Sequence, residues 1–263
     1  MALFVSHETR QIILNPTRTL LFAHPRTGSS SLNLALNAHP RLNLAEDPFW
    51  HGYGAYHPGE KNYVDEVKDV PSLERALEEL FARYNGLKVL DYQLDEKIFD
   101  HLLRKPEFKV IFLQRRNLLR AEVSCHIAEQ TKVWNMMDMN EERQRIYRNL
   151  APIPPDALAS SLEYAADLVR HYTKTLRSRP AGTYIEVFYE DLYAGDLKAN
   201  RAAVCRIFDF LGLDMPQSEV IDHHLDPSRS RINSQSTYQL VPNARQLNEK
   251  FGNERTGWLF PPE

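Results

Sequence analysis

Short apolar runs alternate with longer segments of helical periodicity along this chain. Runs of β-branched and bulky apolar residues predict strands at 19–24, 87–92, 109–114 and 183–189. The run at 109–114 is apolar through its centre, which is typical of a strand buried on both faces of a parallel sheet. The pattern therefore predicts buried strands connected by helices.

The segments between these strands have the spacing of amphipathic helices. From Leu158 to Leu176 the apolar positions step by three and four, and Pro155 and Pro180 bound that helix. Asn85-Gly86 and Gly212 mark other helix ends, so helices are predicted at about 30–37, 71–83, 156–179 and 196–211. This alternation predicts an α/β fold, a three-layer sandwich whose central, mostly parallel β-sheet is flanked by helices.

Two regions interrupt the pattern. Residues 47–70 are rich in Pro, Gly, Tyr and His, and residues 224–263 have little periodicity, so both are predicted as long ordered loops, which in a compact domain are usually functional or disordered. A length of 263 residues suits one or two domains, and we expect a single domain over 1–263.

The composition is that of a globular protein, with 43% hydrophobic and 25% charged residues. A net charge of −3 gives no support to sequence-independent nucleic-acid binding. No apolar run reaches the ~18–20 residues of a membrane span, and His7, Glu8 and Arg10 come too early for a signal peptide, so we expect a cytoplasmic protein. Cys125 and Cys205 lie in predicted helices, and we expect buried thiols and no disulfide.

The first candidate site is the turn after the strand at 19–24, Pro25-Arg26-Thr27-Gly28-Ser29-Ser30-Ser31. A glycine turn that opens a helix aims backbone N–H groups and the positive end of the helix dipole at one point, which suits a phosphate. Hydroxyl groups add donors, and Arg26 adds a delocalised charge. The turn lacks the Lys and the second Gly of G-x-x-x-x-G-K-[ST], which disfavours a kinase or ATPase. A serine-rich helix cap without a ligand is the structural alternative.

The second candidate site begins with Arg115-Arg116-Asn117, directly after the strand at 109–114. Open α/β sheets place their ligands at this carboxyl edge. Ser124 lies a little over two turns into the next helix, so Arg116 and Ser124 together could hold a second phosphate. An arginine pair bound to carboxylates at the sheet edge is the alternative.

In combination, the two motifs resemble those of the sulfotransferases that use 3′-phosphoadenosine 5′-phosphosulfate (PAPS). The pattern is most similar to their bacterial carbohydrate-modifying branch, including the nodulation-factor sulfotransferases, in which P-R-T-G is followed by hydroxyl residues and R-R-N precedes a helix. The resemblance covers about 19–50, 86–134 and 183–213, with a fainter similarity over 232–247. Tyr189-Glu190-Asp191-Leu192 and the helix end at Phe210-Leu211-Gly212 fit the family's C-terminal part.

The resemblance implies a P-loop-containing three-layer sandwich in which the loops at about 47–70 and 224–263 cover the acceptor and the nucleotide. It also implies sulfuryl transfer from PAPS to a hydroxyl of a carbohydrate or another small hydroxylated acceptor, leaving 3′,5′-adenosine bisphosphate (PAP). It assigns the 5′-phosphosulfate to Arg26, Thr27, Gly28, Ser29, Ser30 and Ser31, and the 3′-phosphate to Arg116 and Ser124. Arg26 replaces the Lys of many cytosolic members, and we expect it to act electrostatically, because a guanidinium does not readily give up a proton. The usual basic-glycine segment near the C-terminus is absent, and the candidates to cover the nucleotide instead are Arg229, Arg231, Ser234 and Gln235.

The resemblance also points to the general base. Carbohydrate-modifying members use a Glu soon after the first helix, which corresponds to Glu46 here, with Asp47 as the neighbouring alternative. Other members use a His, and the candidates by position are His24, His51 and His57. The adjacent His223 and His224 lack a zinc-like spacing with other ligands, so no metal is predicted.

Aromatic residues follow the proposed base. The loop contains Trp50, Tyr53, Tyr56 and Tyr63, which could form a platform for a sugar ring or a small core that anchors the loop. Trp134, near the end of the helix with Ser124, could border the acceptor site. The rival functions are a P-loop small-molecule kinase and a non-catalytic nucleotide-binding module.

Overall fold

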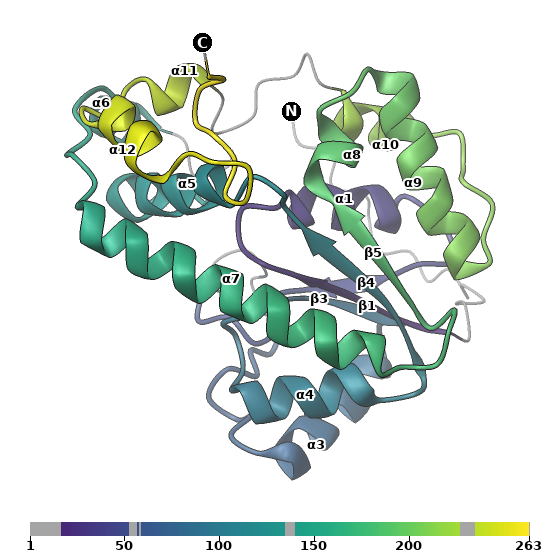
Figure 1. The fold of residues 1–263 in the computed structure, drawn as a ribbon. Coiled ribbons are helices and arrows are strands. Elements are labelled where there is room, and N and C mark those ends of the chain that lie inside the picture. The colour runs from purple at the N-terminus through teal and green to yellow at the C-terminus, as the bar shows by residue number, and fades with distance from the viewer. Residues whose placement is uncertain (1–16, 53–56, 58, 135–139, 227–234, 263) are drawn as a thin grey trace.

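The fold is built on one parallel β-sheet, seen in Figure 1. The computed structural model describes residues 17–52, 57, 59–134, 140–226 and 235–262. Its sheet has five parallel strands in the order β2-β3-β1-β4-β5. The strands are β1 (Arg18–Ala23), β2 (Leu44–Glu46), β3 (Gly86–Leu90), β4 (Phe108–Gln114) and β5 (Tyr184–Phe188). The four strands predicted from the sequence are confirmed, and β2 is additional.

Helices cover both faces of the sheet. One face packs against α1 (Ser29–Asn37), α8 (Tyr189–Tyr193), α9 (Leu197–Leu211) and α10 (Glu219–Leu225). The other face packs against α3 (Val70–Phe81), α4 (Glu96–Arg104) and α7 (Pro155–Arg177). The predicted three-layer α/β sandwich is therefore confirmed.

The central strand shows why the sheet needs both helix layers. From Thr19 to Ala23 every residue of β1 is fully buried. Leu20 and Phe22 belong to the core on the α7 side, and Leu21 and Ala23 belong to the core on the α1 side. Successive side chains of a strand point to opposite faces, so an uninterrupted apolar strand is stable only between two apolar layers.

A third hydrophobic cluster lies beside the sheet. It joins α5 (Leu118–Thr131), α6 (Glu141–Arg148) and the start of α7 to α11 (Gln235–Tyr238) and α12 (Ala244–Phe251). The prediction of a long loop over 224–263 was thus wrong for part of that region. The buried residues Tyr238, Val241, Ala244 and Leu247 recur every third position, but the exposed Leu240 and Pro242 between them hide this spacing.

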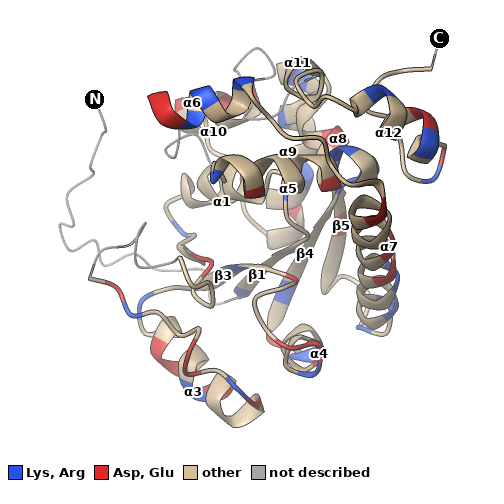
Figure 2. Cartoon of the chain, turned by 90° about the vertical axis from the view of Figure 1, so that its left-hand side faces the viewer, with Lys and Arg blue, Asp and Glu red and all other residues tan. Residues whose placement is uncertain are grey.

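The two cysteines and the charged residues of the long helix can also be located in the structure. Cys125 on α5 and Cys205 on α9 are free thiols, as expected, but both are half-buried and not buried. Lys, Arg, Asp and Glu are interspersed along α7 (Figure 2). Among the described helices, none has both the length and the hydropathy that a membrane crossing requires.

Candidate active site

The first motif forms a tight turn between β1 and α1, at the carboxyl edge of the sheet. Gly28 caps α1 in the left-handed conformation, with a φ of 81°. A Cβ atom at this position would lie 2.5 Å from the ring of Tyr193, so a side chain does not fit. The Tyr193 hydroxyl donates a hydrogen bond of 2.9 Å to the Gly28 carbonyl oxygen. The turn is therefore held closely against α8.

The hydroxyl residues of the motif surround the start of α1. Thr27 is buried, and its hydroxyl donates to the carbonyl oxygen of His24 at 2.7 Å, which closes the turn. Ser29, Ser30 and Ser31 form the first turn of α1, which has no acidic side chain. The predicted phosphate-loop residues thus form one continuous turn in front of a helix N-terminus, where an anion is stabilised.

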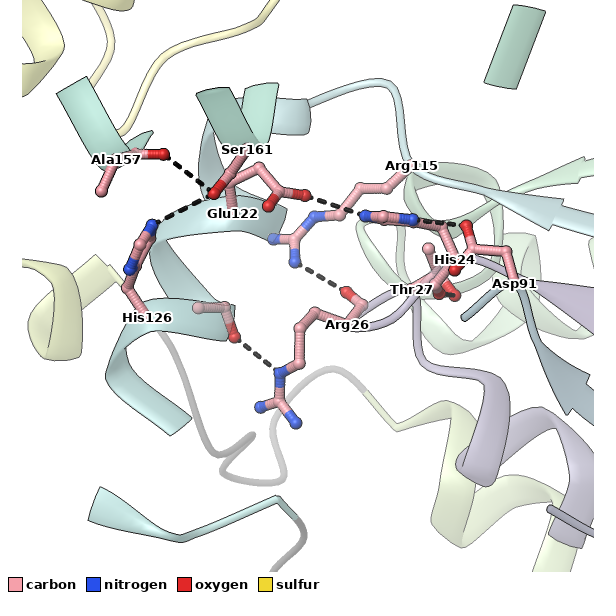
Figure 3. Close-up of polar contacts among 10 residues, drawn as sticks. His24, Arg26, Thr27, Asp91, Arg115, Glu122, His126, Ala157 and Ser161 are labelled. Carbon is pink, nitrogen blue, oxygen red and sulfur yellow. Dashed lines mark hydrogen bonds and ion pairs between the residues drawn. The ribbon is translucent and has the colours of Figure 1, made fainter. Parts of the chain in front are cut away.

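Arg26 connects the two motifs. Its Nε atom donates to the Ser124 hydroxyl oxygen at 2.8 Å, and its Nη1 atom donates to the carbonyl oxygen of Trp134 at 2.6 Å. Arg115 in turn donates from Nη1 to the carbonyl oxygen of Arg26 at 3.0 Å (Figure 3). The end of α5 and the R-R-N motif therefore meet the phosphate loop at one place.

Arg115 is a site residue to which the sequence assigned no role. Its guanidinium lies 4.3 Å from the ring centre of Tyr189, and its Nη2 atom is 3.4 Å from the hydroxyl of Tyr238. Its buried Nε atom has no hydrogen-bond acceptor among the described residues. A buried donor without an acceptor is costly, and a bound anion would satisfy it.

Arg116 makes different contacts. It forms a two-pronged ion pair with Asp191, at 2.7 and 2.9 Å, and it lies over the ring of Phe188. The backbone N–H groups of Arg116 and Asn117 donate to the Glu190 carboxylate at 3.0 and 3.1 Å. The structure thus joins Ser124 to Arg26 and Arg116 to Asp191, so the pairing of Arg116 with Ser124 on a phosphate stays a prediction.

Glu46 and Asp47 lie at the end of β2. The Nζ atom of Lys88 is 3.6 Å from Glu46 Oε1 and forms a close ion pair with Asp47 Oδ2. Asp47 Oδ1 accepts a hydrogen bond of 2.7 Å from Gln93. Burial raises the pKa of Asp47, and Lys88 acts against that increase. Both oxygens of Asp47 are engaged, whereas the Glu46 side chain remains 25% exposed.

Lys88 and Gln93 were not identified from the sequence. The available signal for Lys88 was a lysine within the otherwise apolar strand Gly86–Leu90, a position where a cation is buried only with partners. Gln93 follows the strand in a turn and had no comparable signal.

His24 is enclosed by two carboxylates. Its Nδ1 atom is 2.6 Å from Asp91 Oδ2, and its Nε2 atom is 2.8 Å from Glu122 Oε1 (Figure 3). Burial by itself lowers the pKa of His24, but the two carboxylates outweigh it and raise the pKa to about 10. An imidazolium with both nitrogens bonded cannot accept a proton at neutral pH, so these contacts argue against His24 as the base.

The other aromatic and histidine candidates lie as follows. Tyr63 is 2% exposed and packs edge-on against Phe49, so it belongs to the core and not to a sugar platform. Trp50 and His57 are half-buried, and His51 is exposed. The remaining candidates Tyr53, Tyr56, Arg229, Arg231 and Ser234 lie outside the described residues, and Gln235 begins α11.

The fold and the site together define a class of protein. A parallel sheet with a hydroxyl-rich phosphate loop after its central strand, and arginines after the next strand, is the architecture of a phosphate-binding α/β protein. No cluster of three or more His, Cys, Asp or Glu side chains within the described ranges is arranged to hold a metal ion.

Comparison with known proteins finds a relative that matches most of the chain. The chain is 26% identical over 254 residues to Nodulation protein H of Rhizobium meliloti (strain 1021), a sulfotransferase; the match covers 91% of this chain and 93% of that protein. It confirms the resemblance found in the sequence motifs. A comparison with models of known protein families found no match.

Among solved structures the likenesses are distant. The sulfotransferase domain of the Synechococcus PCC 7002 olefin synthase has 18% identity and a TM-score of 0.43, covering 87% of this chain and 94% of that one. The sulfotransferase STF9 from Mycobacterium avium has 14% identity and a TM-score of 0.42, and the match covers 92% of this chain and 79% of that one. Retinol dehydratase in complex with retinol and PAP has 17% identity and a TM-score of 0.41, and the match covers 88% of this chain and 72% of that one.

Proposed function

We propose that this protein is a PAPS-dependent sulfotransferase that acts on a hydroxyl group of a carbohydrate or a similar small hydroxylated acceptor by in-line transfer. The observation that carries the proposal is the convergence of the phosphate loop, Arg26 and Ser124 at the carboxyl edge of the sheet. The similarity to Nodulation protein H supports the same class of reaction.

The residues present fit the donor. Gly28 lets the turn pack closely against Tyr193, and α1 directs its first N–H groups and its dipole at the space in front of the turn. The unsatisfied Nε atom of Arg115 offers a further donor. When bound, PAPS supplies the sulfuryl group: the acceptor oxygen bonds to sulfur while the bond from sulfur to the 5′-phosphate oxygen breaks, and its electron pair stays on PAP.

Arg26 stabilises the charge that develops on the leaving phosphate. Burial lowers the pKa of Arg26, yet a guanidinium remains protonated at physiological pH. Arg26 therefore acts through its charge and its fork of donors, and not by giving up a proton. Arg116 binds the 3′-phosphate by exchanging its Asp191 partner for a phosphate, which offers the same two-pronged geometry.

Glu46 serves as the general base. It takes the proton of the acceptor hydroxyl while that oxygen bonds to sulfur. Asp47 is the less suitable of the two carboxylates, because Lys88 and Gln93 already occupy its oxygens. The Glu46 side chain keeps an exposed fraction through which an acceptor can reach it.

A thermal-shift titration tests the proposal. PAP is compared with ATP and 5′-AMP, with and without Mg²⁺. At a ~100-fold excess over its dissociation constant, a specific ligand stabilises the protein by about 2.7 kcal/mol. Selective, metal-independent stabilisation by PAP is expected. A Mg²⁺-dependent preference for ATP would instead indicate a kinase, and the absence of any shift with PAP would remove the proposed function.

An acceptor screen then tests turnover. Wild-type protein is incubated with PAPS and a panel of mono- and oligosaccharides beside phenolic and aliphatic alcohols, and PAP release is measured. Release that depends on a sugar hydroxyl is expected. Release only with non-sugar alcohols would reject the carbohydrate acceptor, and tight PAP binding without turnover on any acceptor would favour a non-catalytic module.

A further inference from the structure

The side chain of Lys88 lies between the phosphate loop and the two carboxylates. Lys88 registers with Leu21 of β1 and with Glu46 of β2 in the parallel sheet. Leu21 belongs to the core beneath α1, and side chains one position apart alternate between faces. Lys88 and Glu46 therefore share the sheet face that α1 covers.

Three groups surround the Lys88 amine. Asp47 Oδ2 is in close contact with it, Glu46 Oε1 lies 3.6 Å away, and the hydroxyl oxygen of Ser30, in the first turn of α1, lies 3.5 Å away. An ammonium group has three donor hydrogens, which matches this number of neighbours. The side chain is 2% exposed, and a buried cation needs partners of this kind.

We propose that Lys88 is a positioning residue for sulfuryl transfer: its amine keeps the adjacent Glu46 and Asp47 together in ionised form and sets the position of Glu46 relative to the phosphate loop. This inference rests on the proposed function. It gives the two carboxylates different tasks, with Asp47 anchoring Lys88 and Glu46 facing the acceptor.

The charges around the pair explain why a cation is needed. Two neighbouring carboxylates repel each other, and burial already raises the pKa of Asp47. Tyr92, after β3, is a further acidic group near Asp47, Gln93 contributes a neutral donor, and α1 has no charged residue. Lys88 is thus the cation that contacts both carboxylates, and without it Asp47 takes up a proton at higher pH.

The contact with Ser30 joins the base to the donor site. Ser30 is in the first turn of α1, where the phosphosulfate is expected to bind. Lys88 lies in a central strand of the sheet, so its backbone position is rigid. A fixed link between the loop and the base holds the acceptor oxygen in line with the leaving group, which is a large contribution to the rate of a transfer reaction.

The test uses Lys88→Met, which keeps the length of the side chain and removes its charge. Lys109→Met is the matched control, because Lys109 is also a strand lysine but donates to the Phe210 carbonyl oxygen, away from both carboxylates. The double variant Lys88→Met with Asp47→Asn removes the uncompensated buried carboxylate, so the test stays possible if the single variant unfolds. Three quantities are measured: PAP affinity, the pH profile of kcat/KM, and the titration of the Asp47 carboxyl carbon by NMR without ligand.

For Lys88→Met we expect a loss of kcat of roughly 100-fold. PAP affinity should change far less than kcat, and the acid limb of the pH profile should move to higher pH. The Asp47 titration should move in the same direction, and Lys109→Met should behave as wild type in all three measurements. In the double variant kcat should remain reduced, because Glu46 still lacks the amine that positions it.

Two results overturn the inference. An unmoved Asp47 titration shows that Lys88 does not hold the carboxylates, and a loss of PAP affinity as large as the loss of kcat shows that Lys88 only supports the loop. Wild-type protein that does not bind PAP at all contradicts the proposed function itself, and with it any role of Lys88 in transfer. The NMR titration needs neither ligand nor acceptor, so these failures are distinguishable.

Discussion

The Nε atom of Arg26 donates a hydrogen bond of 2.8 Å to the hydroxyl oxygen of Ser124, 98 residues further along the chain. This contact joins the turn after β1 to the helix after β4, the two places where phosphate binding was predicted. Because β1 and β4 are adjacent and parallel, the segments that follow them emerge at the same edge of the sheet. One guanidinium therefore connects the two segments for which phosphate binding was predicted.

Replacing Arg26 should affect transfer more than folding. Arg26→Gln removes the charge at the leaving phosphate, and we expect kcat to fall by about 10²–10³-fold. Arg26→Lys keeps the charge without the fork of donors, so its kcat should lie between those of the wild type and Arg26→Gln. Steady-state kinetics with PAPS checks both, with the exposed Arg148→Gln on α6 as a control. Wild-type kcat in Arg26→Gln would contradict the electrostatic role.

The two carboxylates at the end of β2 should differ in their effects. Glu46→Gln removes the base, so kcat should decrease by about 10²–10⁴-fold while PAP still stabilises the protein. Asp47→Asn should mainly lower thermal stability, because it leaves buried Lys88 without its closest partner. The exposed Glu78→Gln on α3 is a neutral control. The reverse pattern, with turnover lost in Asp47→Asn and kept in Glu46→Gln, would make Asp47 the base.

The ion pair between Arg116 and Asp191 predicts a specific change in nucleotide selectivity. Arg116→Ala should weaken PAP binding by ~10-fold or more and leave 5′-AMP binding unchanged, because only PAP has a 3′-phosphate. Asp191→Asn releases Arg116 from a competing carboxylate and should leave PAP binding equal or tighter. Calorimetric titration measures both. An equal loss for PAP and 5′-AMP in Arg116→Ala would place the 3′-phosphate elsewhere.

A comparison of Gly28 with Gly182 separates two contributions to the loss of stability, steric crowding by a neighbouring side chain and backbone strain. Gly28 and Gly182 have φ values of 81° and 77°, but only at Gly28 would a Cβ meet another side chain. Gly182→Ala should cost about 1 kcal/mol for its left-handed backbone. Gly28→Ala should cost clearly more, since the Tyr193 ring must also move, and should weaken PAP binding. Urea denaturation of both variants tests this, and equal losses of stability would show that Tyr193 yields freely.

The His24 cluster predicts how stability depends on pH. The folded-state pKa is raised from 6.5 to about 10, so the protonated imidazole stabilises the fold. This contribution is complete below about pH 6.5, the unfolded value, and is lost as the pH rises towards about 10. Urea unfolding of wild type and His24→Gln between pH 6 and pH 10 should therefore give stabilities that converge at high pH. A difference that is constant over this range would show that His24 is neutral in the folded protein.

Much of the fold followed from local patterns. The continuous apolar run of β4 and the three-four spacing of α7 each appear within one segment, and the structure confirms both. β2 was missed because three residues are too few to show a period, although it places Glu46 and Asp47. α12 was missed because its buried positions are separated by charged and amide residues.

The sequence by itself determined the layered α/β fold and predicted the phosphate loop and the class of reaction, because each depends on residues that are neighbours along the chain. Only the tertiary structure decided which side chains share a site. Lys88 with Glu46, His24 with Asp91 and Glu122, and Arg116 with Asp191 come from separate segments that parallel pairing and helix packing bring together. Such contacts depend on strand order and register, which no single segment encodes.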